Sequence, residues 1–345
     1  MIKQVLKNVG ITLALFILMI NASAQKVTLL QQGRAVSIRG LSVVNDKVAW
    51  VSGNKGYVAV TKDAGKTWIW QQVRGFEQSD FRDIEAFSDK EALIMSSGTP
   101  ALILKTTDGG ANWQVKYRNR DTSVFLDAMD FHGKYGCAMS DPSNNHFVLF
   151  ETTDKGNTWK AREMAKSPLA RNDEAAFAAS GTCLNIFDNG LIKSNSILMV
   201  TGGSVANMIQ AHIDEKKWST QQLPIAQGRS SAGAFSVATN GKNWVVVGGD
   251  YQRDTRTDST ACYSNDAGKT WKIAKVTPTF LSCVQHIDSK IYLATGTAGT
   301  YLSKDEGLTW TKIDGGSYNV CIKTQHGKLT LLAGGNGKIA MFSMK

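Results

Sequence analysis

Five short segments of this sequence share one pattern, and that pattern decides the fold: TKDAGKTW (61–68), TTDGGANW (106–113), TTDKGNTW (152–159), SNDAGKTW (264–271) and SKDEGLTW (303–310). Each has a serine or threonine, then an aspartate, a glycine and a closing tryptophan at fixed spacing. The carboxylate can accept hydrogen bonds from the backbone of its own turn, and glycine adopts positive φ without a steric penalty. The pattern therefore predicts five copies of one tight turn, each followed by a strand.

The aspartates of these turns invite a metal-binding or catalytic interpretation, which we reject. A turn that recurs around a fold cannot bring five carboxylates to one site. We therefore assign them a structural role, and the sequence has no Cys/His cluster that would indicate a metal site. The five aspartates are Asp63, Asp108, Asp154, Asp266 and Asp305.

The repeats have a period that is typical of β-propeller blades. Consecutive tryptophans lie 45, 46 and 39 residues apart, whereas Trp159 and Trp271 are separated by 112 residues. That long interval contains a degenerate copy of the motif, HIDEKKW, which ends at Trp218 and lacks the glycine. Repeats of this length, each with several strands and turns, predict an all-β propeller.

Alternation of apolar and polar residues gives each repeat four strands and predicts seven blades. Six complete sets cover 37–68, 82–113, 125–159, 174–218, 232–271 and 280–310. The C-terminal end supplies three further strands, and the missing fourth is KVTLLQQ at 26–32. Pairing the two termini would complete the seventh blade and remove two exposed sheet edges.

The first 24 residues have the features of a secretory signal peptide. Two lysines precede an apolar run from Ile11 to Ile20, and Ala22-Ser23-Ala24 fits a cleavage site before Gln25. Ten apolar residues are too few to span a bilayer. We expect a periplasmic or secreted protein in which residues 25–345 form a single propeller domain, without a membrane span.

Charge and cysteine content exclude several other classes. The net charge of +10 is scattered among acidic residues, so we expect no nucleic-acid partner. We also expect the protein to be a monomer. The glycine-rich turns GTAG (296–299) and GGNG (334–337) open no helix, so no dinucleotide cofactor is expected. Of the five cysteines, Cys283 and Cys321 should occupy matching positions on adjacent inner strands, where a disulfide or two free thiols both remain open.

The repeated motif is the Asp-box, or bacterial neuraminidase repeat. With FRDIEAF (81–87), FLDAMDF (125–131), SDP (140–142), EAAFAASGTC (174–183) and GGDY (248–251), the chain resembles the photosystem II stability/assembly factor family. The resemblance implies a binding or assembly factor without an established chemistry. Sialidases share the box but carry an Arg-Ile-Pro-like segment before it, whereas this chain has Ser37-Ile38-Arg39-Gly40.

Propeller geometry predicts where a site would lie. The Asp-boxes are third-to-fourth turns and mark one face, whereas ligands usually bind at the channel mouth of the opposite face. A group of carboxylates, one arginine and one tyrosine falls on or near loops of that opposite face: Arg82, Asp83, Asp127, Asp141, Glu174, Asp250 and Tyr251.

Two functions fit this group of residues. The first is a non-enzymatic protein that binds another protein or a polysaccharide there. The second is a carbohydrate-active enzyme that uses two of the carboxylates as acid and base, or as acid and nucleophile. We favour binding, because no complete catalytic set can be named.

Overall fold

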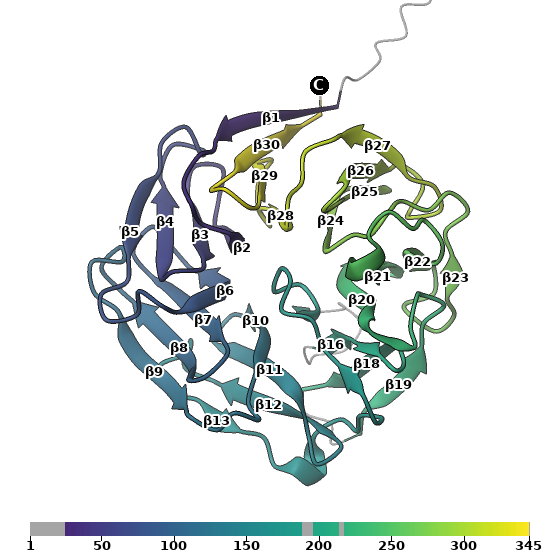
Figure 1. Cartoon of the computed structure of the whole chain (residues 1–345), viewed down its shortest axis with the longest axis horizontal. Helices are drawn as coiled ribbons and strands as arrows, with labels where there is room; N and C mark the ends of the chain where they lie inside the picture. Colours follow the sequence, from purple (N-terminus) through teal and green to yellow (C-terminus); the bar gives the residue numbers. More distant parts are fainter. Residues whose placement is uncertain (1–24, 188–195, 214–216, 345) are drawn as a thin grey trace, which may run out of the picture.

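The computed structural model describes residues 25–187, 196–213 and 217–344, and they form a ring of seven small antiparallel sheets (Figure 1). The predicted seven-bladed propeller is therefore confirmed. The predicted signal peptide, residues 1–24, lies outside the described residues. Within the described part of the chain, no helix has the length and apolar character needed to cross a bilayer.

The first three blades follow one plan, with strands in chain order from the channel outward. Blade 1 comprises β2 (Ile38–Val43), β3 (Ala49–Gly53), β4 (Tyr57–Thr61) and β5 (Ile69–Gln72). Blade 2 comprises β6 (Asp80–Ala86), β7 (Ala92–Ser97), β8 (Ala101–Thr106) and β9 (Gln114–Asn119). Blade 3 comprises β10 (Leu126–His132), β11 (Tyr135–Ser143), β12 (His146–Thr152) and β13 (Lys160–Ala161).

The next three blades keep this plan, and blades 4 and 5 carry insertions. Blade 4 comprises β15 (Leu184–Phe187), β16 (Ser196–Val200), β18 (Asn207–His212) and β19 (Ser219–Gln222). Blade 5 comprises β20 (Arg229–Asn240), β21 (Asn243–Asp250), β22 (Ala261–Ser264) and β23 (Lys272–Ile273). Blade 6 comprises β24 (Cys283–Asp288), β25 (Ile291–Gly296), β26 (Gly299–Ser303) and β27 (Thr311–Asp314).

Blade 7 joins the two ends of the described chain. It comprises β28 (Val320–Lys323), β29 (Thr330–Ala333), β30 (Ile339–Ser343) and, at the outer edge, β1 (Lys26–Gln31). Strand β1 runs antiparallel to β30, with Lys26 opposite Ser343 (Figure 1). The predicted composite closing blade is therefore confirmed, and it pairs the strands that meet at the ring's junction.

Four short elements lie outside the blade pattern. Two are short strands, β14 (Glu174–Ala175) and β17 (Gly202–Gly203), which extend the sheet of blade 5 through pairing of β17 with β20. Two are 3-10 helices, η1 (Met164–Lys166) and η2 (Tyr251–Arg253). Both short strands lie at the inner edge of blade 5, next to β20, so the departures from regularity concentrate at one sector of the ring.

The apolar core lies between neighbouring blades, because both faces of each sheet are covered. The middle strands β3, β7 and β8 are buried along most or all of their length. Polar links at the channel then hold adjacent inner strands together: Asp83 Oδ2 accepts from the Met129 N–H at 2.7 Å, and Ser236 Oγ accepts from the Val284 N–H at 2.9 Å. Apolar packing thus supplies the bulk of stability, and these bonds fix the register between blades.

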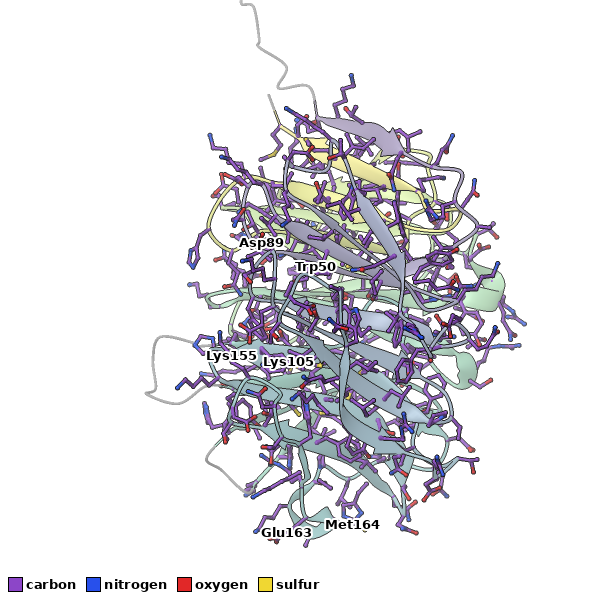
Figure 2. The ribbon with its side chains drawn as sticks, turned by 90° about the vertical axis from the view of Figure 1, so that its left-hand side faces the viewer. Trp50, Asp89, Lys105, Lys155, Glu163 and Met164 are labelled. Atoms are coloured by element: carbon purple, nitrogen blue, oxygen red, sulfur yellow. The ribbon has the colours of Figure 1, made fainter. Side chains whose placement is uncertain are left out.

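The two faces of the ring carry different sets of loops. One, the Asp-box face, carries the first-to-second and third-to-fourth turns; Asp89 and Lys155, one from each kind of turn, lie on the same side in Figure 2. The other, the mouth face, carries the connections between blades and the second-to-third turns.

Candidate functional site

The mouth face is crossed by an insertion that precedes blade 4. Residues 171–182, here called the crossing segment, contact the inner strands of several blades. Ser180 Oγ donates to the Ser282 carbonyl at 2.8 Å, and Thr182 Oγ1 lies 2.6 Å from Ser236 Oγ. The crossing segment therefore passes over the inner ends of blades 5 and 6.

The prediction that the inner strand of blade 4 starts at Glu174 is wrong. The inner strand is β15, which begins at Leu184, and Glu174 belongs to β14 in the crossing segment. The alternating apolar residues of EAAFAASGTC resemble a strand, but they pack over the channel instead. The extra length between Trp159 and Trp218, 59 residues, was the signal for an insertion.

Glu174 holds the crossing segment in place. Its Oε1 accepts from Thr201 Oγ1 at 2.5 Å and from Asn207 Nδ2 at 2.9 Å, and its Oε2 accepts from the Arg171 N–H at 2.8 Å. The side chain is 4% exposed. A buried carboxylate with three donors is a structural anchor, so it has little capacity left for a ligand.

Asp83 lies at the bottom of the channel rather than on the open mouth. Its two oxygens accept from the N–H groups of Ile84 and Met129, and a Cβ added at Gly181 would lie 2.3 Å from Oδ1. Burial raises the pKa of Asp83 to about 7, against the effect of these two donors. The crossing segment needs a glycine at 181 because backbone and carboxylate meet there at positive φ.

Two further carboxylates, which were not predicted from the sequence, lie beside Asp83. Burial raises the pKa of Asp130 to about 7, and burial with the charges of Asp130 and Asp83 raises that of Glu85 well above its usual value. All three line a channel cavity of about 520 Å³, whose rim includes His286 and His326. The lining also includes Gly133 and Lys155, which belong to turns on the Asp-box face, so the cavity opens toward that face. FRDIEAF and FLDAMDF held the signal, because each carries two acidic residues: Asp83 and Glu85 in one, Asp127 and Asp130 in the other.

Four inner strands have one extra residue at the same level, where their pairing register shifts. The extra residues are Arg39, Arg82, Asp127 and Phe235. A β-bulge changes the direction in which a side chain points. Each of four blades therefore turns one side chain of its inner strand toward the mouth face. The sequence predicted Arg82 and Asp127 here but missed Arg39 and Phe235.

Asp127 is the most unusual of these residues. It is fully buried, and neither carboxylate oxygen accepts a hydrogen bond of ordinary distance and angle from another described residue, although the N–H groups of Ala178 and Asp141 lie near enough to lower its pKa. Burial raises its pKa well above the usual value; the charge of Asp141 acts in the same direction and that of Arg82 opposes it. Asp141 itself accepts from the Ala176 N–H at 3.0 Å, so both aspartates lie beneath the crossing segment. Asp127 cannot meet a ligand directly, which is a correction to its predicted place on an open mouth.

Arg82 and Asp250 each take part in an ion pair. Arg82 Nε lies 2.7 Å from Asp80 Oδ2, and its guanidinium lies over the Phe125 ring. Asp250 Oδ2 is 3.5 Å from Arg229 Nε, while its Oδ1 accepts from the Gln252 N–H and caps η2. Both residues thus position loops of the mouth face.

Tyr251 is the one predicted site residue with a widely exposed side chain, at 48%. Its ring meets Phe177 and Phe235 edge-on, and those two rings stack at 3.9 Å between centroids. Phe280 packs edge-on against Phe235. An aromatic cluster from the crossing segment and blades 5 and 6 therefore forms part of the mouth face.

The Asp-box turns show the hydrogen bonds expected of a structural role. In the first box, Asp63 Oδ1 accepts from the Thr67 N–H at 2.9 Å and Oδ2 accepts from the Thr67 hydroxyl at 2.6 Å. The other four boxes repeat this arrangement, with Asn112 replacing threonine in one. These bonds, first of all the one from the threonine hydroxyl, lower the pKa of Asp63, Asp154 and Asp266 to about 2.

Two of the cysteines meet at the channel, as their spacing predicted. Cys283 Sγ lies 3.3 Å from the Cys321 carbonyl oxygen, and all five cysteines are free and buried. Hydrogen bonds that include one with Cys321 lower the pKa of Cys283 to about 7 against the effect of burial. Among the described residues, no group of three His, Cys, Asp or Glu side chains is arranged to hold a metal ion.

Comparison with known proteins supports the family resemblance. The profile of the family described as Photosynthesis system II assembly factor YCF48 matches residues 69–170. Photosystem II assembly lipoprotein Ycf48 of Synechococcus sp. (strain CC9902) is 21% identical over 264 residues, which cover 67% of this chain and 73% of that protein. Chloroplastic photosystem II stability/assembly factor HCF136 of Arabidopsis thaliana is 29% identical over 115 residues, 32% of this chain and 27% of that protein.

Solved structures support the same fold. The structure described as YCF48 bound to D1 peptide covers 93% of this chain and 97% of its own, with a TM-score of 0.64 and 13% sequence identity. At that identity the likeness shows the fold alone. Together with the sequence matches, it confirms that the chain resembles the photosystem II stability/assembly factor family and shares its propeller.

Proposed function

We propose that this chain is a non-enzymatic, assembly-factor-like propeller that binds a segment of another protein on its mouth face. The similar YCF48 structure is described as bound to a peptide, which makes a protein partner the first choice. The chain's own residues supply the rest of the argument.

The observation that carries the proposal is the placement of the arginines. The sequence has eleven, and all lie in blade connections, in second-to-third turns or at the mouth ends of strands; Arg162, directly after β13, is set aside because it is buried in an ion pair with Glu151. The ten are Arg34, Arg39, Arg74, Arg82, Arg118, Arg120, Arg171, Arg229, Arg253 and Arg256. Arginine is enriched at protein interfaces because its guanidinium binds carboxylates through two parallel hydrogen bonds and also packs on aromatic rings.

Most of these arginines are available for a partner. Three form ion pairs, with Asp80, Asp250 and Asp258. The other seven have no ion pair among the described residues, and Arg253 is exposed beside the exposed ring of Tyr251. A segment that combines carboxylates with an apolar side chain fits such a surface.

The carbohydrate-active alternative gains no support from the geometry. Asp127 is fully buried and Glu174 is bonded to three donors, so neither is placed as an acid or a nucleophile toward a sugar. We further propose that the protein acts in the periplasm or outside the cell. That proposal rests on the signal-peptide features of residues 1–24, and fractionation of cells that express the full chain tests it.

Site-specific photo-crosslinking tests the binding face. A photo-reactive residue replaces Arg253 in one variant and Lys304, exposed in an Asp-box turn, in the matched control. Crosslinking in living cells should give one protein adduct from position 253 and none from position 304. An adduct from position 304 with none from position 253 would place the partner on the other face.

A further inference from the structure

The crossing segment is fixed at its two ends. At one end β14 pairs with β17, and Glu174 accepts hydrogen bonds from three donors. At the other end Ser180 and Thr182 bond to residues of blades 5 and 6. Residues 176–179, here called the cover, lie between these two attachments.

The cover has few hydrogen bonds to the rest of the ring among the described residues. The Ala176 N–H donates to Asp141 Oδ1 at 3.0 Å, and the Arg39 guanidinium donates to the Ala179 carbonyl at 3.4 Å. The Ala179 N–H bonds inside the cover, to the Phe177 carbonyl. Few bonds to the surrounding structure are typical of segments that open locally while the rest of the fold stays intact.

Beneath the cover lies the carboxyl group of Asp127, which is 0% exposed. Neither of its oxygens accepts a hydrogen bond of ordinary distance and angle from another described residue, although the Ala178 N–H of the cover is close. A buried carboxyl group in such surroundings is stable only in its neutral form. In water the same group is ionised at neutral pH. An ionised Asp127 is therefore incompatible with a closed cover.

The charged groups around Asp127 do not reverse this effect of burial. The charge of Asp141 acts in the same direction as burial, whereas that of Arg82 opposes it, and Arg82 Nε already lies 2.7 Å from Asp80 Oδ2. Burial is the largest cause, and it raises the pKa of Asp127 well above the usual value. The titratable and charged groups near Asp127 or its cover are Arg39 of β2, Asp80, Arg82 and Asp83 of β6, Asp141 of β11 and Cys183 just before β15.

The direction of the pH effect follows from these surroundings. With the cover closed, Asp127 keeps its proton well above the pH at which an aspartate in water loses it, which is about pH 4. Because the open state binds this proton less tightly, loss of the proton favours opening. Each pH unit between the two values raises the open population by up to about tenfold.

We propose that the cover is a pH-sensitive switch, closed over Asp127 while that carboxyl group is neutral and lifted when it ionises. Lifting separates Phe177 from Phe235, whose rings stack at 3.9 Å between centroids, and so takes apart the aromatic cluster of the mouth face. As regulation of the partner site this inference rests on the proposed function, whereas the lifting itself can be measured on the chain alone.

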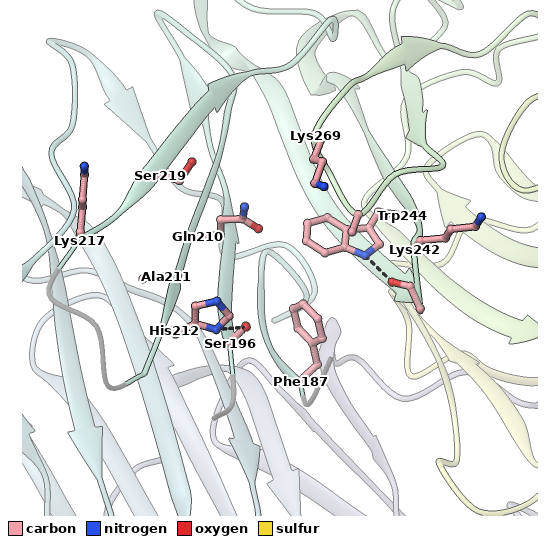
Figure 3. A pocket seen from close by; sticks show the side chains of 12 residues that line it. Phe187, Ser196, Gln210, Ala211, His212, Lys217, Ser219, Lys242, Trp244 and Lys269 are labelled. Atoms are coloured by element: carbon pink, nitrogen blue, oxygen red, sulfur yellow. Dashed lines mark hydrogen bonds between the residues drawn. The ribbon is translucent and has the colours of Figure 1, made fainter. Parts of the chain in front are cut away.

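Histidine side chains also change charge between pH 5 and pH 8, so their positions matter. Among the described residues, none of the five histidines has a hydrogen bond to the crossing segment. His212, for example, has its Nδ1 3.0 Å from Ser196 Oγ in a hollow between blades 4 and 5 on the Asp-box face (Figure 3). Substitution of Asp127 alone therefore separates the switch from these histidines.

Hydrogen exchange of the mature chain at pH 5 and pH 7 tests the proposal. The protection factor compares the exchange rate of each amide with that of an unfolded chain at the same pH, which removes the pH dependence of the exchange chemistry. We expect the protection of the Ala176 and Ala179 amides to fall at least about tenfold from pH 5 to pH 7. At pH 7 these amides should be at least about tenfold less protected than those of the buried strand β7.

Asp127→Asn keeps the size of the side chain and removes its titration, so the fall in protection should be at least about tenfold smaller. Asp173→Asn, at an exposed position of the same segment, is the matched control and should behave like the parent chain. Protection in the parent that does not change with pH would overturn the proposal. So would equal protection of the cover and β7 at pH 7, because the cover would then open only when the whole ring unfolds, and so would an unaltered pH dependence in Asp127→Asn. None of these results depends on a partner, so they stand whether or not position 253 crosslinks to one.

Discussion

The aspartates of the Asp-box turns and those near the mouth are the same residue in opposite surroundings. In the turns, threonine and backbone donors lower the pKa of Asp266 to about 2. Beneath the crossing segment, burial raises the pKa of Asp83 to about 7, and neither oxygen of Asp127 accepts a hydrogen bond of ordinary distance and angle from another described residue. A repeated aspartate whose carboxylate accepts several hydrogen bonds marks a turn. Buried aspartates with few hydrogen bonds or opposite charges nearby mark the irregular part of the ring.

The largest expected effect concerns Asp83 and pH. Its folded-state pKa of about 7 lies above its usual value of 3.8, so the folded chain binds the extra proton. Stability should therefore fall as pH rises from about 4 to about 7, and Asp130, whose pKa burial raises in the same way, contributes to the same fall. Asp83→Asn removes the contribution of Asp83 to that loss, although at pH 5 it costs about 1 kcal/mol for one weakened hydrogen bond. Urea unfolding at pH 5 and pH 8 measures both.

At pH 5 the parent should be more stable than the Asp83→Asn variant, and at pH 8 the variant should be more stable than the parent. A variant that loses as much stability as the parent from pH 5 to pH 8 would show that Asp83 is already ionised at low pH, as an ordinary aspartate would be.

A smaller but still large effect is expected at the anchor of the crossing segment. Glu174→Ala leaves three donors without their acceptor and should destabilise the chain by about 2–4 kcal/mol. Asp173→Asn, at an exposed neighbouring position, should change stability by less than about 0.5 kcal/mol. Denaturant midpoints of the two variants compare them directly. Equal midpoints would mean that the crossing segment is not anchored by Glu174.

An aspartate of an Asp-box turn, Asp266, should have a modest effect on stability, with a pH dependence opposite to that of Asp83. Asp266→Ala should lower the melting temperature by about 1–3 °C at pH 7 through loss of the turn's acceptor. Because its pKa is lowered, Asp266 contributes stability above pH 3.8, and the contribution is lost as pH falls toward 2. In scanning calorimetry, the difference in melting temperature between the parent and Asp266→Ala should be smaller at pH 3 than at pH 7. Loss of partner crosslinking at position 253 without any change in melting would contradict the structural role.

The smallest effect is expected at the cysteines. All five thiols are buried and free, so none should react quickly with a thiol reagent in the folded chain. After unfolding without a reductant, five should react. A count of three would mean that Cys283 and Cys321 had formed a disulfide at the channel.

Regular features of the ring could be predicted from sequence because each is local or repeated. The five turns, the strand alternation and the spare strand at 26–32 together predicted seven blades and their closure. The Cys283 and Cys321 positions followed from equal spacing in successive repeats.

The irregular features could not be predicted, because they depend on contacts between distant segments. Nothing local distinguishes EAAFAASGTC from an inner strand; only its packing over the inner ends of other blades does. The same reason explains Asp127, whose buried position follows from the crossing segment above it. Arg39 and Phe235 were missed because the register shifts that aim them appear only after strands are paired.

The difference between the two groups of aspartates can be measured directly by carbon-13 NMR titration of the aspartate side-chain carboxyls. Substitution to asparagine at 83, 127 and 266 assigns the three signals. The structure predicts that Asp266 titrates near pH 2, Asp83 near pH 7 and Asp127 well above the usual range for an aspartate. Titration of all three near their common usual value of 3.8 would contradict the account.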